Sequence, residues 1–336
     1  NIQFATPMDP QSLEGKVSIS GFSAKDLEGR VFTSETSLSA NLPLKPSTSY
    51  TVNLAAGATD RYGQTMGGYR FSFTTGALPS SVSLALPGYS TAATYSSTTE
   101  PIVYFQSTNL PSVRFTLYPL TPDEGRRMLH DPSQPGSRTF TPSQSALRTW
   151  AETVQGVKDN VVLGSTSLSG GGPLPKGYYF AHTSGEVRSQ FAFAVVDTVI
   201  VTKLSTNELL AWAIDHDSGK PLAGAIVHAT GPGIAPEDVR TDADGLASFS
   251  VPIPTLGKNL GDRSYLLWVD GGGHNAVVST RWQQGVSPYQ FGIPGDFFAR
   301  EWVGHLYTDR PIYRPGETVE YKGIVRADDD AQYSIP

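Results

Sequence analysis

The side chains that could bind a metal ion are scattered along this sequence rather than grouped. Histidine is the commonest metal ligand, and the six histidines are His130, His182, His216, His228, His274 and His305. No two of them form the His-Glu-x-x-His pair of zinc proteases, so a zinc site would have to be assembled by the fold alone. Cysteine is absent, which excludes a disulfide framework, thiolate metal ligands and a cysteine nucleophile in this chain.

Two acidic turns share part of the spacing of a calcium-binding loop. Asp242 and Asp244 precede Gly245, but no oxygen ligands follow at the expected intervals and no glutamate closes the loop. Asp60, followed by Gly63, is the second candidate. We interpret both as ordinary turns, because Asp and Gly are residues that such turns prefer.

The motifs of common enzyme classes are missing as well. The sequence contains no Gly-x-Ser-x-Gly, no Gly-x-x-x-x-Gly-Lys-Ser/Thr and no Gly-x-Gly-x-x-Gly after a predicted strand. Asp and Glu fall mostly in predicted turns and on exposed strand faces, so no acid–base pair can be nominated. The sequence therefore predicts a protein that is not an enzyme and that has no catalytic, cofactor-binding or metal-binding residues.

The composition indicates a mainly β protein. Glycine and proline number 34 and 25 in 336 residues, an excess typical of many short strands and turns. A chain of this length is expected to hold about two to four domains. The formal net charge is −6 without a basic cluster, so nucleic acid is not an expected partner. The longest apolar run, Phe191 to Val201, contains Asp197 and is too short to span a bilayer.

Two short helices are predicted among the strands. The segment Thr121–Glu124 (TPDE) supplies an N-cap, a proline at the first helical position and an acidic residue three positions after the cap. The segment Thr141–Gln144 (TPSQ) has the same order of a threonine N-cap followed by proline. Leu147, Trp150 and Val154 then follow it at helical spacing, so we expect a second helix there.

Aromatic residues are frequent in the later strands. We expect them to pack in the core and between modules, because each can bury a large apolar area. An exposed subset that docks a partner is the alternative left open. The residues concerned are Trp268, Trp282, Tyr289, Phe291, Phe297, Phe298 and Trp302.

A tight corner stands near the C-terminus. The segment Arg314–Glu317 (RPGE) places proline second and glycine third, as a type II turn requires. After the turn, Tyr321, Gly323 and Val325 alternate with charged residues, which is the pattern of a half-buried strand. Pro311 and Pro315 cannot donate to a strand ladder, so we expect the segment between them to lie at a sheet edge or a corner. The sequence therefore predicts a corner that leads into a half-buried strand.

The sequence around this corner, YTDRPIYRPGETVEYKGIVR, resembles the start of a macroglobulin module in the bacterial branch of the alpha-2-macroglobulin superfamily. The segment YPLTPDE, at the start of the first predicted helix, resembles sequences of the same family. The segments PMDP and RFSFTTG resemble bacterial Ig-like modules. For the corner the resemblance implies a structural signature and no site. The signature residues are Tyr307, Thr308, Asp309, Arg310, Pro311, Ile312, Tyr313, Arg314, Pro315, Gly316 and Glu317.

The resemblance and the spacing of turns together predict a tandem array of Ig-like and macroglobulin-like antiparallel β-sandwiches. Residues 1–77 are expected to be a bacterial Ig-like sandwich, and 78–198 a macroglobulin-like unit that carries the two short helices. Residues 199–300 are expected to form a macroglobulin or transthyretin-like sandwich. Residues 301–336 would begin a further macroglobulin module that is truncated. Because the chain opens at Asn1 without Met or a signal segment, we expect a mature or excised piece.

The resemblance implies a role in protease inhibition. The chain would be a non-catalytic scaffold segment of a broad-spectrum endopeptidase inhibitor that traps proteases at the bacterial periplasm or cell surface. Its partners would be endopeptidases, reached through the full-length protein, and other modules of the same chain. A membrane would be reached only through a lipid anchor outside this chain, and a thioester would need a cysteine that is not here.

Two other interpretations remain open. The first is an Ig-like surface adhesin or stalk array, which residues 1–77 alone would fit equally well. The second is a set of accessory β-modules from a secreted hydrolase. It is suggested by the segments Asp215–Ala225 and Thr241–Phe249, whose pattern resembles transthyretin-like modules as well as macroglobulin modules. The sequence after Pro336 would distinguish them, because each interpretation expects a different neighbour.

Overall fold

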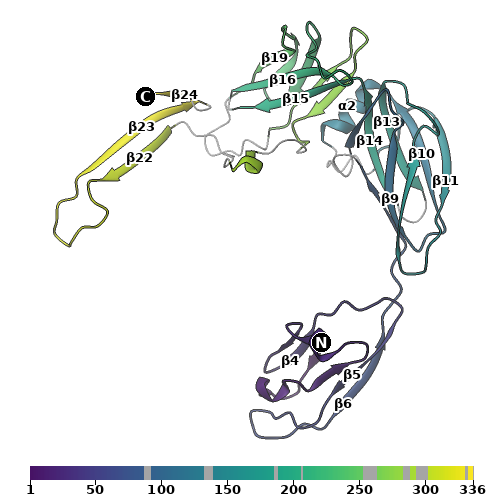
Figure 1. Cartoon of the computed structure of the whole chain (residues 1–336), viewed down its shortest axis with the longest axis vertical. Helices are drawn as coiled ribbons and strands as arrows, with labels where there is room; N and C mark the ends of the chain where they lie inside the picture. Colours follow the sequence, from purple (N-terminus) through teal and green to yellow (C-terminus); the bar gives the residue numbers. More distant parts are fainter. Residues whose placement is uncertain are drawn as a thin grey trace. The chain divides into compact units, whose positions relative to one another are not determined.

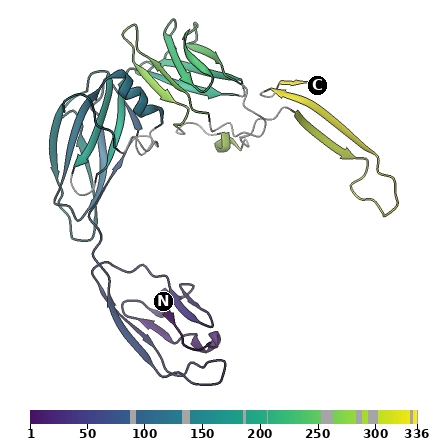
Figure 2. The ribbon, with the colours of Figure 1, turned by 180° about the vertical axis from the view of Figure 1, so that it is seen from behind.

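The computed structural model describes residues 1–86, 92–131, 139–184, 188–205, 207–252, 263–282, 288–292, 302–329 and 332–335. In these residues the chain consists mostly of β-strands in small sheets, with short helices between them (Figure 1, and from behind in Figure 2), which confirms the mainly β prediction. The chain divides into two compact units. The first unit comprises Asn1–Ser81 with the loops Ser107–Pro111 and Gln155–Val162, and the second comprises the remainder.

The first unit contains a sandwich of two three-stranded antiparallel sheets. Its elements are β1 (Ile2–Gln3), the 3-10 helix η1 (Pro10–Leu13), β2 (Val17–Ile19), α1 (Ala24–Leu27), β3 (Val31–Thr33), β4 (Ser37–Ala40), β5 (Ser49–Leu54) and β6 (Tyr69–Thr74). The strand orders are β1-β4-β3 and β2-β5-β6. Along β5, Tyr50, Val52 and Leu54 are buried between the sheets, which is the period-two alternation of a half-buried strand.

A hydrogen-bonded cluster in this unit joins three residues that share an unusual backbone conformation. Ser47, Asn109 and Asp159 are the non-glycine residues with positive φ in the described part of the chain, at 48°, 51° and 63°. The Asp159 carboxylate accepts hydrogen bonds from Ser47 Oγ at 2.5 Å and from Asn109 Nδ2 at 2.9 Å. It also accepts one from the backbone N–H of Leu78 at 2.8 Å. Left-handed backbone is disfavoured outside glycine, so these bonds help to hold it.

The second unit opens with a larger sandwich. Its elements are β7 (Ser81–Ala85), β8 (Ala92–Ser96), β9 (Ile102–Thr108), β10 (Ser112–Leu120), α2 (Pro122–His130), β11 (Arg148–Thr153), β12 (Val161–Ser167), β13 (Gly177–Ser184) and β14 (Gln190–Val196). One sheet has the order β11-β10-β13-β14-β8 and the other the order β12-β9-β7. Strand β8 pairs parallel to β14, whereas β10, β11, β13 and β14 pair antiparallel.

Helix α2 begins where the TPDE segment predicts it. Thr121 is the N-cap: its Oγ1 accepts the backbone N–H of Glu124 at 3.3 Å, and the Glu124 carboxylate accepts the N–H of Thr121 at 3.0 Å. This reciprocal capping box satisfies amide donors that the first turn of a helix leaves free. The prediction of the first helix is confirmed.

The prediction of a second helix is wrong. In the described residues 139–184 no helix begins at Thr141, and Arg148–Thr153 form strand β11 instead. Trp150 lies opposite Phe115 of β10, and the two rings stack with centroids 5.4 Å apart. The indole N–H of Trp150 donates to Thr166 Oγ1 at 2.8 Å.

Strand pairing explains why the helical spacing was misleading. Leu147, Trp150 and Val154 match a helix, but Trp150 and Glu152 also match an alternating strand and lie on its less exposed side. Threonine at two of the three exposed positions, Thr149 and Thr153, favours strand over helix because it is branched at the β-carbon. The free edge of β10 therefore decided the conformation of a segment that is ambiguous by itself.

A second pair of sheets follows in the same unit. Its elements are β15 (Thr198–Leu204), β16 (Glu208–Asp215), β17 (Ile226–Gly231), β18 (Ile234–Arg240), β19 (Leu246–Ser250), β20 (Leu266–Val269) and β21 (Ala276–Ser279). The sheet orders are β15-β16-β19 and β18-β17-β20-β21. Buried side chains from both sheets form one core, including Leu209, Phe249 and Leu267.

The remaining elements are the 3-10 helix η3 (Pro288–Phe291), β22 (Trp302–Thr308), β23 (Tyr321–Asp329) and β24 (Gln332–Ser334). The last three form an antiparallel sheet in the order β22-β23-β24. Phe291 and Trp302 are exposed, which contradicts their expected burial in a core. The expected packing partners Phe297 and Phe298 lie outside the described residues.

Candidate functional site

The signature residues Tyr307–Glu317 lie at the end of β22 and in the loop that leads to β23. The predicted type II turn is confirmed, because the backbone N–H of Glu317 donates to the carbonyl of Arg314 at 3.1 Å and Gly316 has φ 90°. The N–H of Arg314 in turn donates to the Glu317 carboxylate at 3.1 Å. The corner is therefore closed by its own backbone and by one of its own carboxylates.

The charged side chains of the corner are engaged with one another. The hydroxyl of Tyr313 donates to Asp309 Oδ1, and this hydrogen bond lowers the pKa of the Asp309 carboxyl. Arg310 Nε lies 3.2 Å from Asp309 Oδ2, and its guanidinium lies 5.2 Å from the centre of the Tyr313 ring. These contacts hold the charged groups of the corner within the loop itself.

One face of the β22–β23 hairpin is apolar and exposed. Leu306 of β22 is 67% exposed and lies opposite Gly323, while Tyr321 of β23 is 72% exposed and lies opposite Thr308. Val325 lies on the same face, opposite Gly304, and is also exposed. The alternation predicted from the sequence is therefore present, but in this structure it does not produce a buried face.

A second site surrounds helix α2, where it contacts the strands β20 and β21. Arg126 Nη1 lies 3.0 Å from Asp270 Oδ2, and Nη2 lies 2.8 Å from Asp123 Oδ1. The same guanidinium lies 4.8 Å from the centre of the Trp268 ring, within reach of a cation–π contact. Beneath the helix lies Tyr178 of β13, and burial raises the pKa of its hydroxyl to about 12. Arg126 thus ties the helix to the end of β20.

The network continues from Asp270 to a histidine. His228 of β17 stacks on Trp268 with ring centroids 5.1 Å apart. Its Nδ1 lies 2.6 Å from Asp238 Oδ1, and its Nε2 lies 3.0 Å from Asp270 Oδ1. A ring held between two carboxylates can position side chains, but the neighbouring groups include no nucleophile. The network packs α2 against the sheet of β17 and β20.

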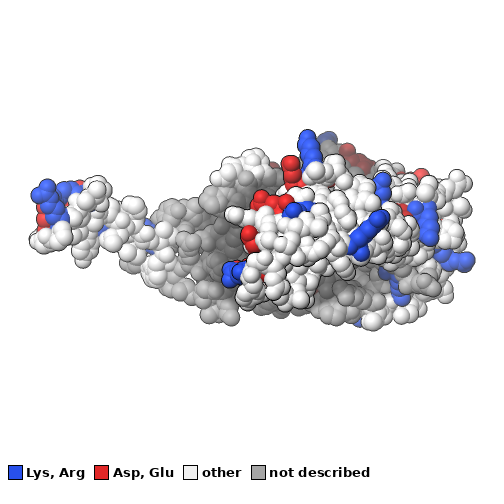
Figure 3. Space-filling model, turned by 90° about the horizontal axis from the view of Figure 1, so that it is seen from below, with Lys and Arg blue, Asp and Glu red and all other residues white. Residues whose placement is uncertain are grey.

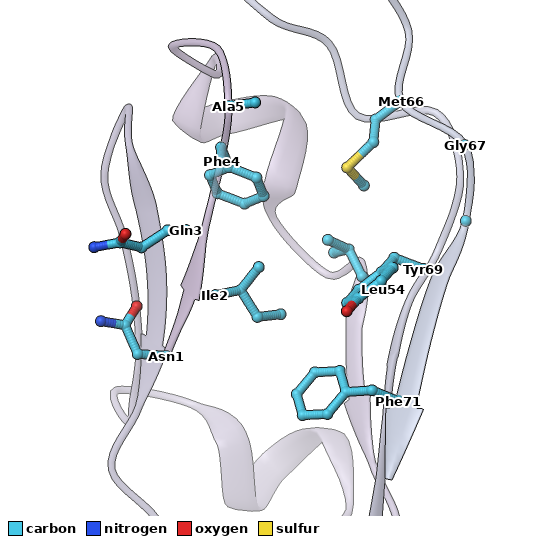
Figure 4. Close-up of a pocket in the computed structure, with 11 residues that line it drawn as sticks. Asn1, Ile2, Gln3, Phe4, Ala5, Leu54, Met66, Gly67, Tyr69 and Phe71 are labelled. Carbon is cyan, nitrogen blue, oxygen red and sulfur yellow. The ribbon is translucent and has the colours of Figure 1, made fainter.

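A cleft of about 570 Å³ opens in the first sandwich between β1 and β6. Figure 4 shows Ile2 and Phe4 on one side facing Leu54, Met66 and Phe71 on the other. Asn1, Gln3 and Tyr69 add polar side chains to this lining, and none of the lining side chains is charged.

The histidines singled out from the sequence are not brought together by the fold. His130 is the last residue of α2, and His228 contacts the Asp270 that also binds Arg126 of that helix. His182 stacks on Tyr118, His305 of β22 lies beside Tyr307, and His216 and His274 contact separate aspartates. Among the residues described by the structure, no group of three or more His, Asp or Glu could hold a metal ion.

The two acidic segments form the turns predicted from their sequence. Asp242 Oδ1 accepts the backbone N–H groups of Asp244 and Leu246, both at 2.9 Å. Asp60 Oδ1 accepts those of Tyr62 and Gln64 at 2.9 and 2.8 Å. Each carboxylate thus accepts backbone hydrogen bonds within its own turn.

Sequence reasoning missed the contact between α2 and strands β20 and β21. A signal for it was present: Leu266–Val269 and Ala276–Val278 are continuous apolar runs, which indicate strands buried on both faces. Leu267 and Val269 point into the core of their own sheets, whereas Leu266 and Val277 pack with the core of the preceding sandwich. The expected role of Trp268 and Trp282 in packing between modules is confirmed, because both pack against that core.

Charges on the surface do not form a large patch of one sign in the face shown in Figure 3. Lysine and arginine are interspersed there with aspartate and glutamate, over a surface that is mostly uncharged. None of the helices in the described part of the chain is both long and apolar enough to span a bilayer.

Comparison with known proteins identifies two modules. Residues 195–297 match the bacterial alpha-2-macroglobulin MG3 domain, and residues 1–75 match a bacterial Ig-like domain. An alpha-2-macroglobulin of Ralstonia nicotianae is 33% identical over 157 residues, which are 46% of this chain and 9% of that protein. The chain therefore spans a small part of the length of this curated relative.

Solved structures show the same arrangement of strands. A Salmonella alpha-2-macroglobulin reacted with methylamine superposes with a TM-score of 0.65 at 17% identity, covering 97% of this chain and 20% of that chain. A mutant of the Salmonella protein gives the same TM-score and coverage at 16% identity. At these identities the likeness is one of fold.

The fold and the corner define a chain of tandem β-sandwiches of the macroglobulin type. The MG3 and Ig-like domain matches and the Ralstonia relative support a place for the chain in the bacterial alpha-2-macroglobulin family.

Proposed function

We propose that this chain is a non-catalytic scaffold segment of a broad-spectrum endopeptidase inhibitor that traps proteases. The observation that carries the proposal is the MG3 domain match over residues 195–297, because it links the chain to a family named for alpha-2-macroglobulin. The corner and the α2 network support it, since their charged groups serve packing and turn formation.

The partners follow from the same proposal. Endopeptidases would be bound by the full-length protein, and other modules of that protein would contact this segment. The compartment would be the periplasm or the cell surface, with any lipid anchor in a part of the protein outside this chain.

The experiment compares the chain with the longer protein that contains it. We expect the longer protein to reduce cleavage of large protein substrates by several unrelated endopeptidases, and the chain alone to have no effect on them. The chain alone should also show no hydrolase turnover and no stoichiometric metal. A longer protein that leaves all endopeptidases active would refute protease trapping, and turnover by the chain would refute the scaffold role.

We also propose the four-part division predicted from the sequence, in which residues 301–336 begin a further macroglobulin module. The exposed apolar face of the β22–β23 hairpin supports this division, because a small sheet without an opposing layer is only marginally stable in water. Amides of Tyr321–Arg326 should exchange hydrogen much faster in this chain than in one extended by a complete module. Equally slow exchange in both would place the hairpin in a sheet of the preceding sandwich.

A further inference from the structure

The two ends of helix α2 are satisfied by different parts of the chain. The N-terminus is capped locally by the Thr121–Glu124 box, as described above. At the C-terminus, the cap residue Asp131 has φ −139° and ψ 88° and is therefore not left-handed. The last carbonyls of a helix have no partner within the helix and need an external donor.

Two donors to these carbonyls come from the end of β21 and the turn that follows it. Trp282 Nε1 donates to the carbonyl of Leu129 at 3.0 Å, and Ser279 Oγ donates to the carbonyl of His130 at 2.6 Å. The turn is itself closed by a bond from the N–H of Trp282 to the carbonyl of Ser279 at 2.9 Å. Arg281 Nη2 lies 3.7 Å from Asp131 Oδ2 beside these bonds. Three consecutive residues at the end of α2 thus contact one four-residue turn about 150 positions later in the chain.

Burial reinforces this contact. The side chain of Leu129 is fully buried, and it belongs to one apolar cluster with Met128 of the helix, Leu266 of β20 and Val277 of β21. A helix of nine residues is too short to be stable by itself in water, since isolated helices below about 12–15 residues are marginal. The last turn of α2 is therefore stabilised by side chains of β20, of β21 and of the turn that follows β21.

We propose that α2 is a conformational coupler between the sandwich of β7–β14 and the sheets of β15–β21. Its C-terminal turn is formed only while the Ser279–Trp282 turn is docked on it. Loosening either partner unwinds that turn, withdraws the donors from Leu129 and His130, and exposes the apolar cluster. The coupling is reciprocal by thermodynamic linkage. If docking of the strands stabilises the last turn of the helix by a given free energy, the formed turn stabilises the docked strands by the same free energy. This device is independent of protease trapping.

Hydrogen exchange in the full chain tests the coupling. The double variant Ser279→Ala, Trp282→Phe removes both donors but keeps the aromatic ring. We expect amides of Arg126–His130 to exchange about tenfold faster in this variant, the effect of losing two ordinary hydrogen bonds. The matched control is Trp150→Phe, which removes the indole N–H that donates to Thr166 and does not touch α2. It should leave α2 exchange unchanged.

The reciprocal variant distinguishes coupling from a purely local contact. Thr121→Ala weakens α2 at its other end, and it should also accelerate exchange of the Arg281 and Trp282 amides, which close the Ser279 turn. Unchanged α2 exchange in the double variant, or an equal acceleration in the Trp150→Phe control, would overturn the proposal. So would a Thr121→Ala effect that stops at the helix. If the double variant does not fold, Ser279→Ala alone should still raise α2 exchange about threefold, and no increase would be decisive against coupling.

Discussion

Gly125 of α2 lies directly on the ring of Tyr178, so that a β-carbon added to Gly125 would come within 2.2 Å of the Tyr178 Cγ atom. Glycine inside a helix normally costs about 0.8–1 kcal/mol relative to alanine. Here it allows the helix to approach β13 closely enough to cover the buried Tyr178 side chain. The position of α2 therefore depends on the lack of a side chain at Gly125. So does the contact between the sandwich of β7–β14 and the sheets of β15–β21.

Replacing Gly125 by Ala should therefore destabilise the second unit although alanine is the better helix former. Overpacking of a well-filled core costs about 1–3 kcal/mol, which exceeds the gain in helix propensity. The measurement is urea unfolding followed by tryptophan fluorescence. Gly271→Ala is the matched control, because a β-carbon there would meet no atom within 4 Å. Equal stability of the Gly125→Ala variant and the wild type would show that α2 can shift away from β13.

The pair Thr121 and Thr141 tests the helix assignment. Thr121→Ala should reduce the free energy of unfolding of the second unit by about 0.5–2 kcal/mol, the usual cost of losing an N-cap. Thr141→Ala should change it by less than about 0.5 kcal/mol, as for an ordinary surface position, because no helix begins there in the described residues. Comparable losses in both variants would mean that Thr141 has a capping role after all.

The Asp159 cluster should make the first unit sensitive to acid. The hydrogen bond from Ser47, followed by the one from Asn109, lowers the pKa of the Asp159 carboxyl. A lowered pKa means that the ionised form stabilises the folded state. That contribution is complete above the unfolded value of about 3.9 and is lost as the pH falls through the lower folded value. Asp159→Asn should therefore be less stable than the wild type at pH 7.

The stability difference between Asp159→Asn and the wild type should shrink below about pH 4. Hydrogen exchange of the β5 amides at pH 7, 5 and 3 would report it, with rates corrected for intrinsic exchange. Glu28→Gln, which neutralises an exposed carboxylate in the same unit, serves as the control. A difference that persists undiminished at low pH would assign the effect of the variant to side-chain shape instead of charge.

The signature corner should depend on Gly316. Its φ of 90° is a left-handed conformation that costs an L-residue about 1–2 kcal/mol. Gly316→Ala should accelerate exchange of the Glu317 amide, which closes the turn, by roughly five- to thirtyfold. Gly304→Ala in the same hairpin is the control, because its nearest neighbour is 3.9 Å away and its φ lies outside the left-handed region. Identical exchange in both variants would refute a type II turn.

Local sequence determined the features that a few neighbouring residues can fix by themselves. The corner at Arg314–Glu317, the acidic turns at Asp60 and Asp242, and the N-cap at Thr121 all form as predicted. Each depends on a backbone preference or on a side chain that bonds to a backbone group within four positions. Such interactions need no information from distant parts of the chain.

Only the tertiary structure decided the features that depend on distant partners. The segment of Trp150 has helical spacing, but pairing with Phe115 on β10 made it a strand. The C-terminus of α2 is completed by Ser279 and Trp282. Local sequence does not specify these contacts. Many segments of the chain carry hydrogen-bond donors and apolar side chains, and only folding decides which of them lies next to β11 or to the end of α2.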